Sequence, residues 1–122
     1  MKPLILIVDD ERSAREGLAR YLSSDYIIYQ ASNGLEAIKQ LHERSDIKVV
    51  LSDIMMPEMD GFELLEKICT EKKDVIVIFM TAYFTIENKD DAMQKGAYDY
   101  LTKPLDLNKL ETTIKNAIKN KN

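Results

Sequence analysis

The sequence predicts an α/β protein built as five strand–helix units, (βα)5, around a doubly wound parallel sheet. Short apolar runs alternate five times with stretches in which apolar residues recur at helical spacing. The runs are apolar throughout, which is typical of strands covered by helices on both faces. Parallel strands need crossovers of this kind, because each connection must pass over a face of the sheet. The 122 residues, 45% of them hydrophobic, suit one domain with a sizeable core.

The first two units share one pattern. Residues 4–8 form an apolar run that ends in Asp9-Asp10-Glu11, and apolar residues then follow helical spacing to about residue 23. Residues 26–29 have the composition of a strand. Asn33 begins a second helical stretch, whose apolar stripe is Ala37, Ile38 and Leu41.

The third unit is centred on Asp53. Residues 49–53 form a run that ends on this carboxylate, which a strand interior would not tolerate unpaired, so Asp53 is expected at a strand tip. Pro57 cannot continue a strand ladder. Asp60 is followed three residues later by Glu63, which is the pattern of a helix N-terminus. Strand, acid, short loop and helix together form the layout of a site on an α/β sheet.

The last two units complete the alternation. Residues 75–80 are wholly apolar, and Thr85 is placed to cap a helix that Gly96 closes. The apolar positions expected on that helix are Ile86, Ala92 and Met93. Residues 98–101 form a short strand, and Asp106 caps a final helix with apolar positions at Leu107, Leu110, Ile114, Ala117 and Ile118.

Charged and polar residues follow four of the five predicted strands. Asp9 and Asp10 follow the first, Asp53 the third, Thr81 the fourth and Lys103 the fifth, and ligands of such sheets bind beyond these carboxyl ends. Converging carboxylates repel one another unless a cation is present, and oxygen ligands without histidine or cysteine favour Mg²⁺. A hydroxyl and an ammonium opposite the metal would complete a clamp for a phosphoryl group. The alternative is an acidic cluster in which Lys103 makes an ordinary ion pair.

Charge and composition narrow the classes of function. The formal net charge of −4 and the pI of about 5.0 disfavour binding of nucleic acid by this domain. The first apolar run is too short for a signal peptide or a membrane span. The single cysteine, Cys69, excludes a disulfide framework and is expected to fill core space, with a reactive thiol as the alternative. A cytoplasmic location without membrane contact is expected. His42 is expected to face solvent from a helix.

Five motifs together carry a resemblance to a known family. They are Val8-Asp9-Asp10-Glu11, Asp53 with MPEMDG at 56–61, MTA at 80–82, GAYDY at 96–100 and Leu101-Thr102-Lys103-Pro104. The chain resembles, over essentially its whole length, the receiver domain of a two-component response regulator. The segment from 81 to 104 is most similar to receivers that precede nitrogen-regulator-type transcription activators. The resemblance implies a flavodoxin-like strand order of 2-1-3-4-5.

The resemblance also implies a role for each matching residue. Asp53 would be the phosphoacceptor, Asp10 a direct Mg²⁺ ligand, and Asp9 its acidic neighbour acting largely through water. Met55 would offer its backbone carbonyl to the metal. Thr81 and Lys103 would be the switch hydroxyl and the phosphate-pairing lysine, and a cis Lys103–Pro104 bond is permitted. The aromatic residue that changes rotamer on activation would be Tyr100.

A function follows from that resemblance. A sensor histidine kinase or phosphotransfer protein would phosphorylate Asp53, and the surface around the fourth helix, fifth strand and fifth helix would change. An output domain or a downstream protein would respond to that change, and the output would be transcriptional. A phosphorylation-dependent homodimer is also compatible with the resemblance. Residues 1–122 would be one receiver domain, whether whole or cut from a longer chain. The resemblance implies that two positions flank the approach of water to the phosphorus, and here they are the bulky Met55 and Tyr83, which suggests a long-lived phosphoryl state.

Two other classes remain open. A Mg²⁺-dependent phosphatase with an aspartyl nucleophile would use similar chemistry, but we would expect a second acid where this chain has Met55. A pure interaction module would bind partners regardless of a phosphoryl donor or Mg²⁺. The thioethers of Met55, Met56 and Met59 are not expected to bind metal, because the oxygen-rich surroundings select a harder ion.

Overall fold

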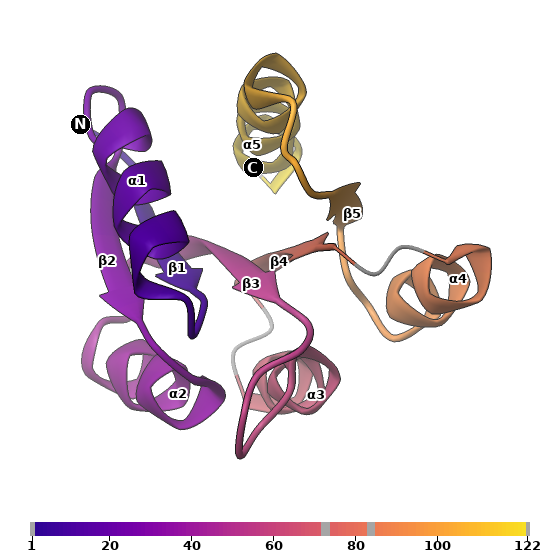
Figure 1. Cartoon of the computed structure of the whole chain (residues 1–122). Helices are drawn as coiled ribbons and strands as arrows, with labels where there is room; N and C mark the ends of the chain where they lie inside the picture. The colour runs from indigo at the N-terminus through magenta and orange to yellow at the C-terminus, as the bar shows by residue number, and fades with distance from the viewer. Residues whose placement is uncertain (1, 72–73, 83–84, 122) are drawn as a thin grey trace.

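Five parallel strands form a single sheet with helices on both faces, as the sequence predicts (Figure 1). The computed structural model describes residues 2–71, 74–82 and 85–121. The strand order is β2-β1-β3-β4-β5, which confirms the order implied by the resemblance. The elements are β1 (Leu4–Val8), α1 (Arg12–Leu22), β2 (Ile27–Ala31), α2 (Gly34–Glu43), β3 (Ile47–Asp53), α3 (Gly61–Glu71), β4 (Ile76–Thr81), α4 (Ile86–Gln94), β5 (Asp99–Thr102) and α5 (Leu107–Lys121).

The sheet separates two apolar layers. Helices α1 and α5 cover one face, and α2, α3 and α4 cover the other (Figure 1). All six residues of β4 are buried, as expected for a strand with helices on both sides. The largest side chain in this strand, Phe79, is fully buried and packs against Phe62 of α3, with ring centroids 5.6 Å apart.

Helix starts lie where the polar residues of the sequence predict them. The side chains of Asn33 and Thr85 accept hydrogen bonds from backbone N–H groups in the first turns of α2 and α4. Asp60 and Glu63 each accept from the other's backbone N–H, which forms a capping box ahead of α3. Gly96 follows α4 with a φ of 111°, a conformation that favours glycine.

Strand boundaries differ by only a few residues from the predicted ones. Tyr26 precedes β2 but is buried, and β3 already begins at Ile47. The last residues of the strands meet at one edge of the sheet, where Asp53 is paired in register with Met80 of β4. That edge carries the candidate site. Within the ranges described, no helix is both long and apolar enough to cross a membrane.

The prediction that Cys69 fills core space is wrong. Cys69 is exposed, and its Sγ lies 3.6 Å from the carbonyl oxygen of Lys95. Of the apolar positions expected on α4 only Ala92 is buried, whereas Ile86 is 72% exposed and Met93 is 40% exposed. In both cases helical spacing identified a plausible face, but the width of the covering contact depends on elements distant in the sequence. His42 is exposed as predicted, and its Nε2 lies 2.6 Å from a Glu71 carboxylate oxygen.

Candidate functional site

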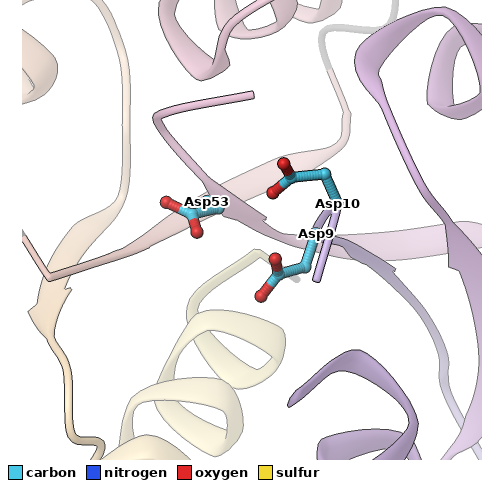
Figure 2. A group of neighbouring side chains, drawn as sticks. All are labelled: Asp9, Asp10 and Asp53. Carbon is cyan, nitrogen blue, oxygen red and sulfur yellow. The ribbon is translucent and has the colours of Figure 1, made fainter. Parts of the chain in front are cut away.

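Three carboxylates converge at the carboxyl edge of the sheet (Figure 2). Asp9 and Asp10 directly follow β1, and Asp53 is the last residue of the neighbouring β3. One oxygen from each side chain lies within 4.8 Å of the others. Asp9 is buried and Asp53 is partly exposed, whereas Asp10 is exposed. The cluster is therefore fixed on one side and open to solvent on the other.

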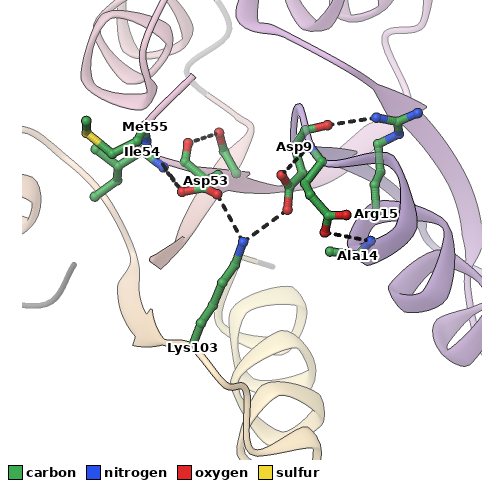
Figure 3. Close-up of polar contacts among 9 residues, drawn as sticks. Asp9, Ala14, Arg15, Asp53, Ile54, Met55 and Lys103 are labelled. Atoms are coloured by element: carbon green, nitrogen blue, oxygen red, sulfur yellow. Dashed lines mark hydrogen bonds and ion pairs between the residues drawn. The ribbon is translucent and has the colours of Figure 1, made fainter. Parts of the chain in front are cut away.

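Lys103 supplies the positive charge of the site from the segment between β5 and α5 (Figure 3). Its Nζ lies 3.0 Å from Oδ2 of Asp53 and 3.1 Å from Oδ2 of Asp9. Burial lowers the pKa of this ammonium, but the hydrogen bonds and charges of the two carboxylates outweigh it, so the pKa of Lys103 is raised. Lys103 therefore stays charged at neutral pH. The Lys103–Pro104 peptide bond is cis, as the resemblance allows.

The carboxylate of Asp53 is oriented by the chain that follows it. Its Oδ1 accepts from the backbone N–H of Ile54 at 2.7 Å and of Met55 at 3.4 Å. Helix α3 begins against the same residue, since a Cβ on Gly61 would lie 2.7 Å from the Asp53 carbonyl oxygen. Only glycine allows this approach, so the position of the Asp53 backbone depends on Gly61. This contact is not among those predicted from the sequence, although the Asp60-Gly61 pair stands directly before the helix.

Thr81 lies on β4 and Tyr100 on β5, the two strands that follow β3 in the order of the sheet. Thr81 is buried at the end of β4, and its carbonyl oxygen accepts from the backbone N–H of Lys103 at 2.8 Å. The ring of Tyr100 is 3% exposed and packs edge-on against Phe79, with centroids 6.4 Å apart. The side chain of Asn88 on α4 hydrogen-bonds the Tyr100 hydroxyl, while burial raises the pKa of this phenol. The inward Tyr100 thereby connects β5 to α4.

The other residues named from the sequence are Tyr83 and the methionines after Asp53. The Met55 side chain is 61% exposed and points away from the core, while Met56 and Met59 are buried. Tyr83 lies outside the described residues. Asp9, Asp10, Asp53, Thr81 and Lys103 all gather at one edge, as predicted from the strand ends.

The donor set fits a hard divalent cation. All three candidate ligands are carboxylates, and the exposed Asp10 leaves one side open for water and for a phosphoryl oxygen. Such a site, with few protein oxygens and room for water, matches the preference of Mg²⁺. Lys103 pairs directly with two of the three carboxylates, which limits their repulsion when no metal is bound.

One open groove lies next to this edge. It runs between α1 and the segment that leads into α5, and Lys103 is one of its lining residues. The other residues that line it are mainly apolar, among them Ala14, Leu18, Tyr21, Pro104, Leu105 and Leu107. Gly17 on α1 also borders the groove, and a Cβ there would have nothing within 4 Å. This surface is not predicted from the sequence, because the residues that line it come from two distant segments of the chain.

The geometry and the motifs agree with the comparisons to known proteins. The family model of the response regulator receiver domain matches residues 5–115. This chain belongs to that family. The receiver domain is 41% identical over 115 residues to the transcriptional regulatory protein ZraR of Klebsiella oxytoca, which covers 93% of this chain but 26% of ZraR. The chain thus spans about a quarter of the length of this relative.

Solved structures give the same result. A response regulator receiver domain protein from Clostridium thermocellum has a TM-score of 0.92 and 31% identity, and the match covers 98% of this chain and 96% of that one. The receiver domain of Ssk1 from Saccharomyces cerevisiae, solved with the histidine phosphotransfer protein Ypd1, has a TM-score of 0.82 and 28% identity, over 90% of this chain and 84% of that one. The sequence-based assignment to response regulator receivers is confirmed.

Proposed function

We propose that this receiver domain takes a phosphoryl group from a phosphohistidine onto Asp53 and uses it to control an output. The observation that carries the proposal is the position of Asp53. It is a partly exposed carboxylate at a strand end, with the Lys103 ammonium 3.0 Å away and two further acids beside it. We infer that residues 1–122 act as one receiver unit.

The reaction is an in-line displacement at phosphorus. An oxygen of Asp53 forms the new P–O bond while the P–N bond of the phosphohistidine breaks, and the imidazole leaves and takes its proton from solvent. Backbone N–H groups of Ile54 and Met55 orient the nucleophile through Oδ1. Lys103 pairs with the charge on the phosphoryl oxygens, which removes repulsion between two anions.

Mg²⁺ would be held by Asp10 directly, by Asp9 largely through water, by Asp53, and by the backbone carbonyl of Met55. When bound, it would neutralise charge on the phosphoryl group during transfer. The exposed position of Asp10 supports this set, because a ligand that keeps solvent access suits a metal that retains water.

The phosphoryl group would act on the rest of the molecule through Thr81 and Tyr100. Its oxygens give the Thr81 hydroxyl a new acceptor, and movement of that hydroxyl would leave room for the ring of Tyr100 to turn. Tyr100 connects to Asn88 on α4, so the change would spread over α4, β5 and α5. To shift a two-state equilibrium from 1:99 to 99:1, the phosphoryl must favour the active state by roughly 5 kcal/mol.

We infer that the donor is a sensor histidine kinase or a phosphotransfer protein, and that it approaches over the groove beside Lys103. That groove is mainly apolar and is lined in part by Lys103, which pairs with Asp53, and the solved pairing of Ypd1 with a receiver supports a donor of this class. The ZraR match supports a transcriptional output, either in a linked domain or in a separate protein. A phosphorylation-dependent homodimer would serve the same output.

The test of the acceptor is a labelling experiment. With Mg²⁺ and a small acyl-phosphate donor, the parent should gain about one acid-labile phosphate per chain, and Asp53→Asn should gain none, because an amide is no nucleophile here. Asp46→Asn, which removes an exposed carboxylate from a turn outside the site, is the matched control and should label fully. Full labelling of Asp53→Asn would exclude Asp53 as the acceptor.

The two alternative classes give different results in the same assay. A phosphatase would release phosphate continuously from many phosphoesters, and an interaction module would take no label at all. Met55 stands where the phosphatase reading requires a second acid, which is why we favour a stable aspartyl phosphate.

The lifetime of that aspartyl phosphate is a separate prediction. Replacing Met55 with Asn, alone or with Tyr83→Glu, should speed loss of label by roughly tenfold or more after the donor is removed, since a polar group could orient the attacking water. Met93→Asn is the matched control, because that methionine is also exposed but lies on α4. An unchanged rate in the double variant would show that these side chains do not limit hydrolysis.

A further inference from the structure

The backbone of Asp9 is held at the point where the sheet stops. The parallel pairing of β1 with β2 ends at Val8 and Ala31, and the Asp9 N–H donates one more bond to the Ala31 carbonyl at 3.1 Å. Beyond it the chain turns into the loop that leads to α1. Hydrogen bonds to β2 therefore fix the backbone nitrogen of Asp9. They do not fix its carbonyl group, which another group must orient.

That group is Arg15, on the first turn of α1 (Figure 3). Its Nη1 donates to the Asp9 carbonyl oxygen at 2.8 Å, and its Nε donates to the side-chain oxygen of Gln30 at 3.1 Å. Gln30 belongs to β2 and is itself held, because its backbone carbonyl accepts from the Gln40 side chain at 2.6 Å. The guanidinium thus bridges the acidic loop and the neighbouring strand, and its planar set of donors suits two bonds in fixed directions.

The Asp9 carboxylate is held independently of Arg15. Its Oδ1 accepts from the Glu11 N–H at 2.9 Å, and its Oδ2 pairs with Lys103 at 3.1 Å. In Figure 3 Arg15 lies on one side of Asp9, whereas Lys103 and Asp53 lie on the other. What Arg15 adds is control of the Asp9–Asp10 peptide plane, because the carbonyl it binds and the Asp10 nitrogen belong to the same rigid unit.

We propose that Arg15 is a positioning residue for the metal site: by holding the Asp9 carbonyl, it fixes the peptide from which Asp10 projects toward Asp53. The inference rests on the Mg²⁺ site of the proposed function. Asp10 is the exposed member of the cluster, whereas Asp9 is buried and Asp53 is partly exposed, so we expect its direction to depend on its backbone. Removing a group that orients a metal ligand without touching the metal typically weakens metal binding by roughly tenfold to a hundredfold.

A charge effect and a positioning effect predict opposite results. Arg15 carries a positive charge close to an acidic cluster, so its removal should tighten binding of a cation if charge were its only influence. If Arg15 positions Asp10, its removal should weaken binding of the same cation. The sign of the change in Mg²⁺ affinity therefore separates the two.

The test is to titrate the whole chain with MgCl2. Calorimetry measures the Mg²⁺ affinity directly, and the rise in melting temperature with MgCl2 gives a second measure of binding. Arg15→Ala should weaken Mg²⁺ binding about tenfold, and the Asp10 amide should exchange faster with solvent even without Mg²⁺. Arg15→Lys, which keeps one donor but not the fork, should recover most of the affinity. Arg12→Ala is the matched control, because Arg12 lies on the same turn and pairs only with Glu16 among the interactions described.

The outcomes are distinct. Weaker binding in Arg15→Ala with recovery in Arg15→Lys and no loss in Arg12→Ala supports the proposal. Equal or tighter binding in Arg15→Ala overturns it, even if the melting temperature falls, since that would make Arg15 a structural contact alone. Should Arg15→Ala fail to fold, Gln30→Ala removes only the second anchor, and unchanged Mg²⁺ affinity there also overturns the proposal. If the parent binds no Mg²⁺, or Asp10→Ala binds it as well as the parent, the metal site itself is wrong.

Discussion

Helices α4 and α5 precede and follow the same strand, β5, in the chain, but they are attached to the sheet very differently. Three side chains of α5, namely Leu110, Ile114 and Ala117, are fully buried. On α4 the only buried residue is Ala92, and Ile86 at its start is 72% exposed. Hydrophobic burial stabilises a helix roughly in proportion to the area removed from water. The α5 contact is therefore strong, and the α4 contact is weak.

The difference shows where the molecule can change without unfolding. Regions with few buried apolar contacts open at low free energy, and switching elements are drawn from such regions. Helix α4 also carries Asn88, whose side chain hydrogen-bonds Tyr100 of β5. A change in the orientation of Tyr100 would therefore act on the helix that resists it least.

The largest expected effect lies in α5. Leu110→Ala should lower the free energy of unfolding by about 2–5 kcal/mol, because it leaves a cavity in a fully buried layer. Urea denaturation would measure the loss. The matched substitution on the other helix, Ile86→Ala, should change stability by less than about 0.5 kcal/mol, since its side chain is mostly in water. Equal losses in the two variants would contradict the comparison.

A second expected effect is local. Backbone amides in the middle of α4 should exchange with solvent on the order of tenfold to a hundredfold faster than those in the middle of α5, because α4 can open without the rest of the domain. Hydrogen exchange followed by NMR would measure both helices in one sample. Labelling with an acyl phosphate should then alter exchange in α4 more than in α5. A larger change in α5 would place the switch elsewhere.

The smallest expected effect concerns alkaline pH. Burial raises the pKa of Tyr100, so the folded state prefers the neutral phenol and the unfolded chain ionises first. This contribution to stability is present below about pH 10, the unfolded value, and is lost as the pH rises through the folded pKa. Tyr100→Phe should make that loss shallower by at most about 1.4 kcal/mol per pH unit. Urea denaturation at a series of pH values would measure the free energy of unfolding of the parent and of Tyr100→Phe. Identical pH profiles for the two proteins would show that Tyr100 titrates in the folded state as it does in the unfolded chain.

Much of the fold follows from local patterns. The helix starts at Asn33, Asp60 and Thr85 are confirmed, because a cap depends on residues only three positions apart. The continuous apolar runs likewise identify the strands. The exposure of Ile86 and Cys69 could not be read in this way. Helical spacing indicates a face, but what covers that face comes from distant parts of the chain.

In the candidate site, too, some residues could be predicted from the sequence and others could not. Asp9, Asp53, Thr81 and Lys103 could be predicted together, because the ends of parallel strands share one edge of the sheet. The contribution of Arg15 could not, since an arginine in a helical stretch usually faces solvent and nothing nearby in sequence points to the Asp9 carbonyl. The dependence of the β3–α3 loop on Gly61 required atomic positions as well.

The pairing of Lys103 with the acidic cluster also determines which ionic charge would neutralise the site. Leaving aside the guanidinium of Arg15, which bonds the main chain of Asp9 rather than a carboxylate, three carboxylates against one ammonium leave two formal negative charges, which is the amount that a single divalent ion balances. A monovalent ion would leave the site anionic, and a trivalent ion would leave it cationic. The proposed phosphorylation would replace the single charge of the Asp53 carboxylate by about two on the phosphoryl group. A loaded site would thus pass from neutrality to a surplus of negative charge, and that surplus would draw in the nearest hydroxyl donor.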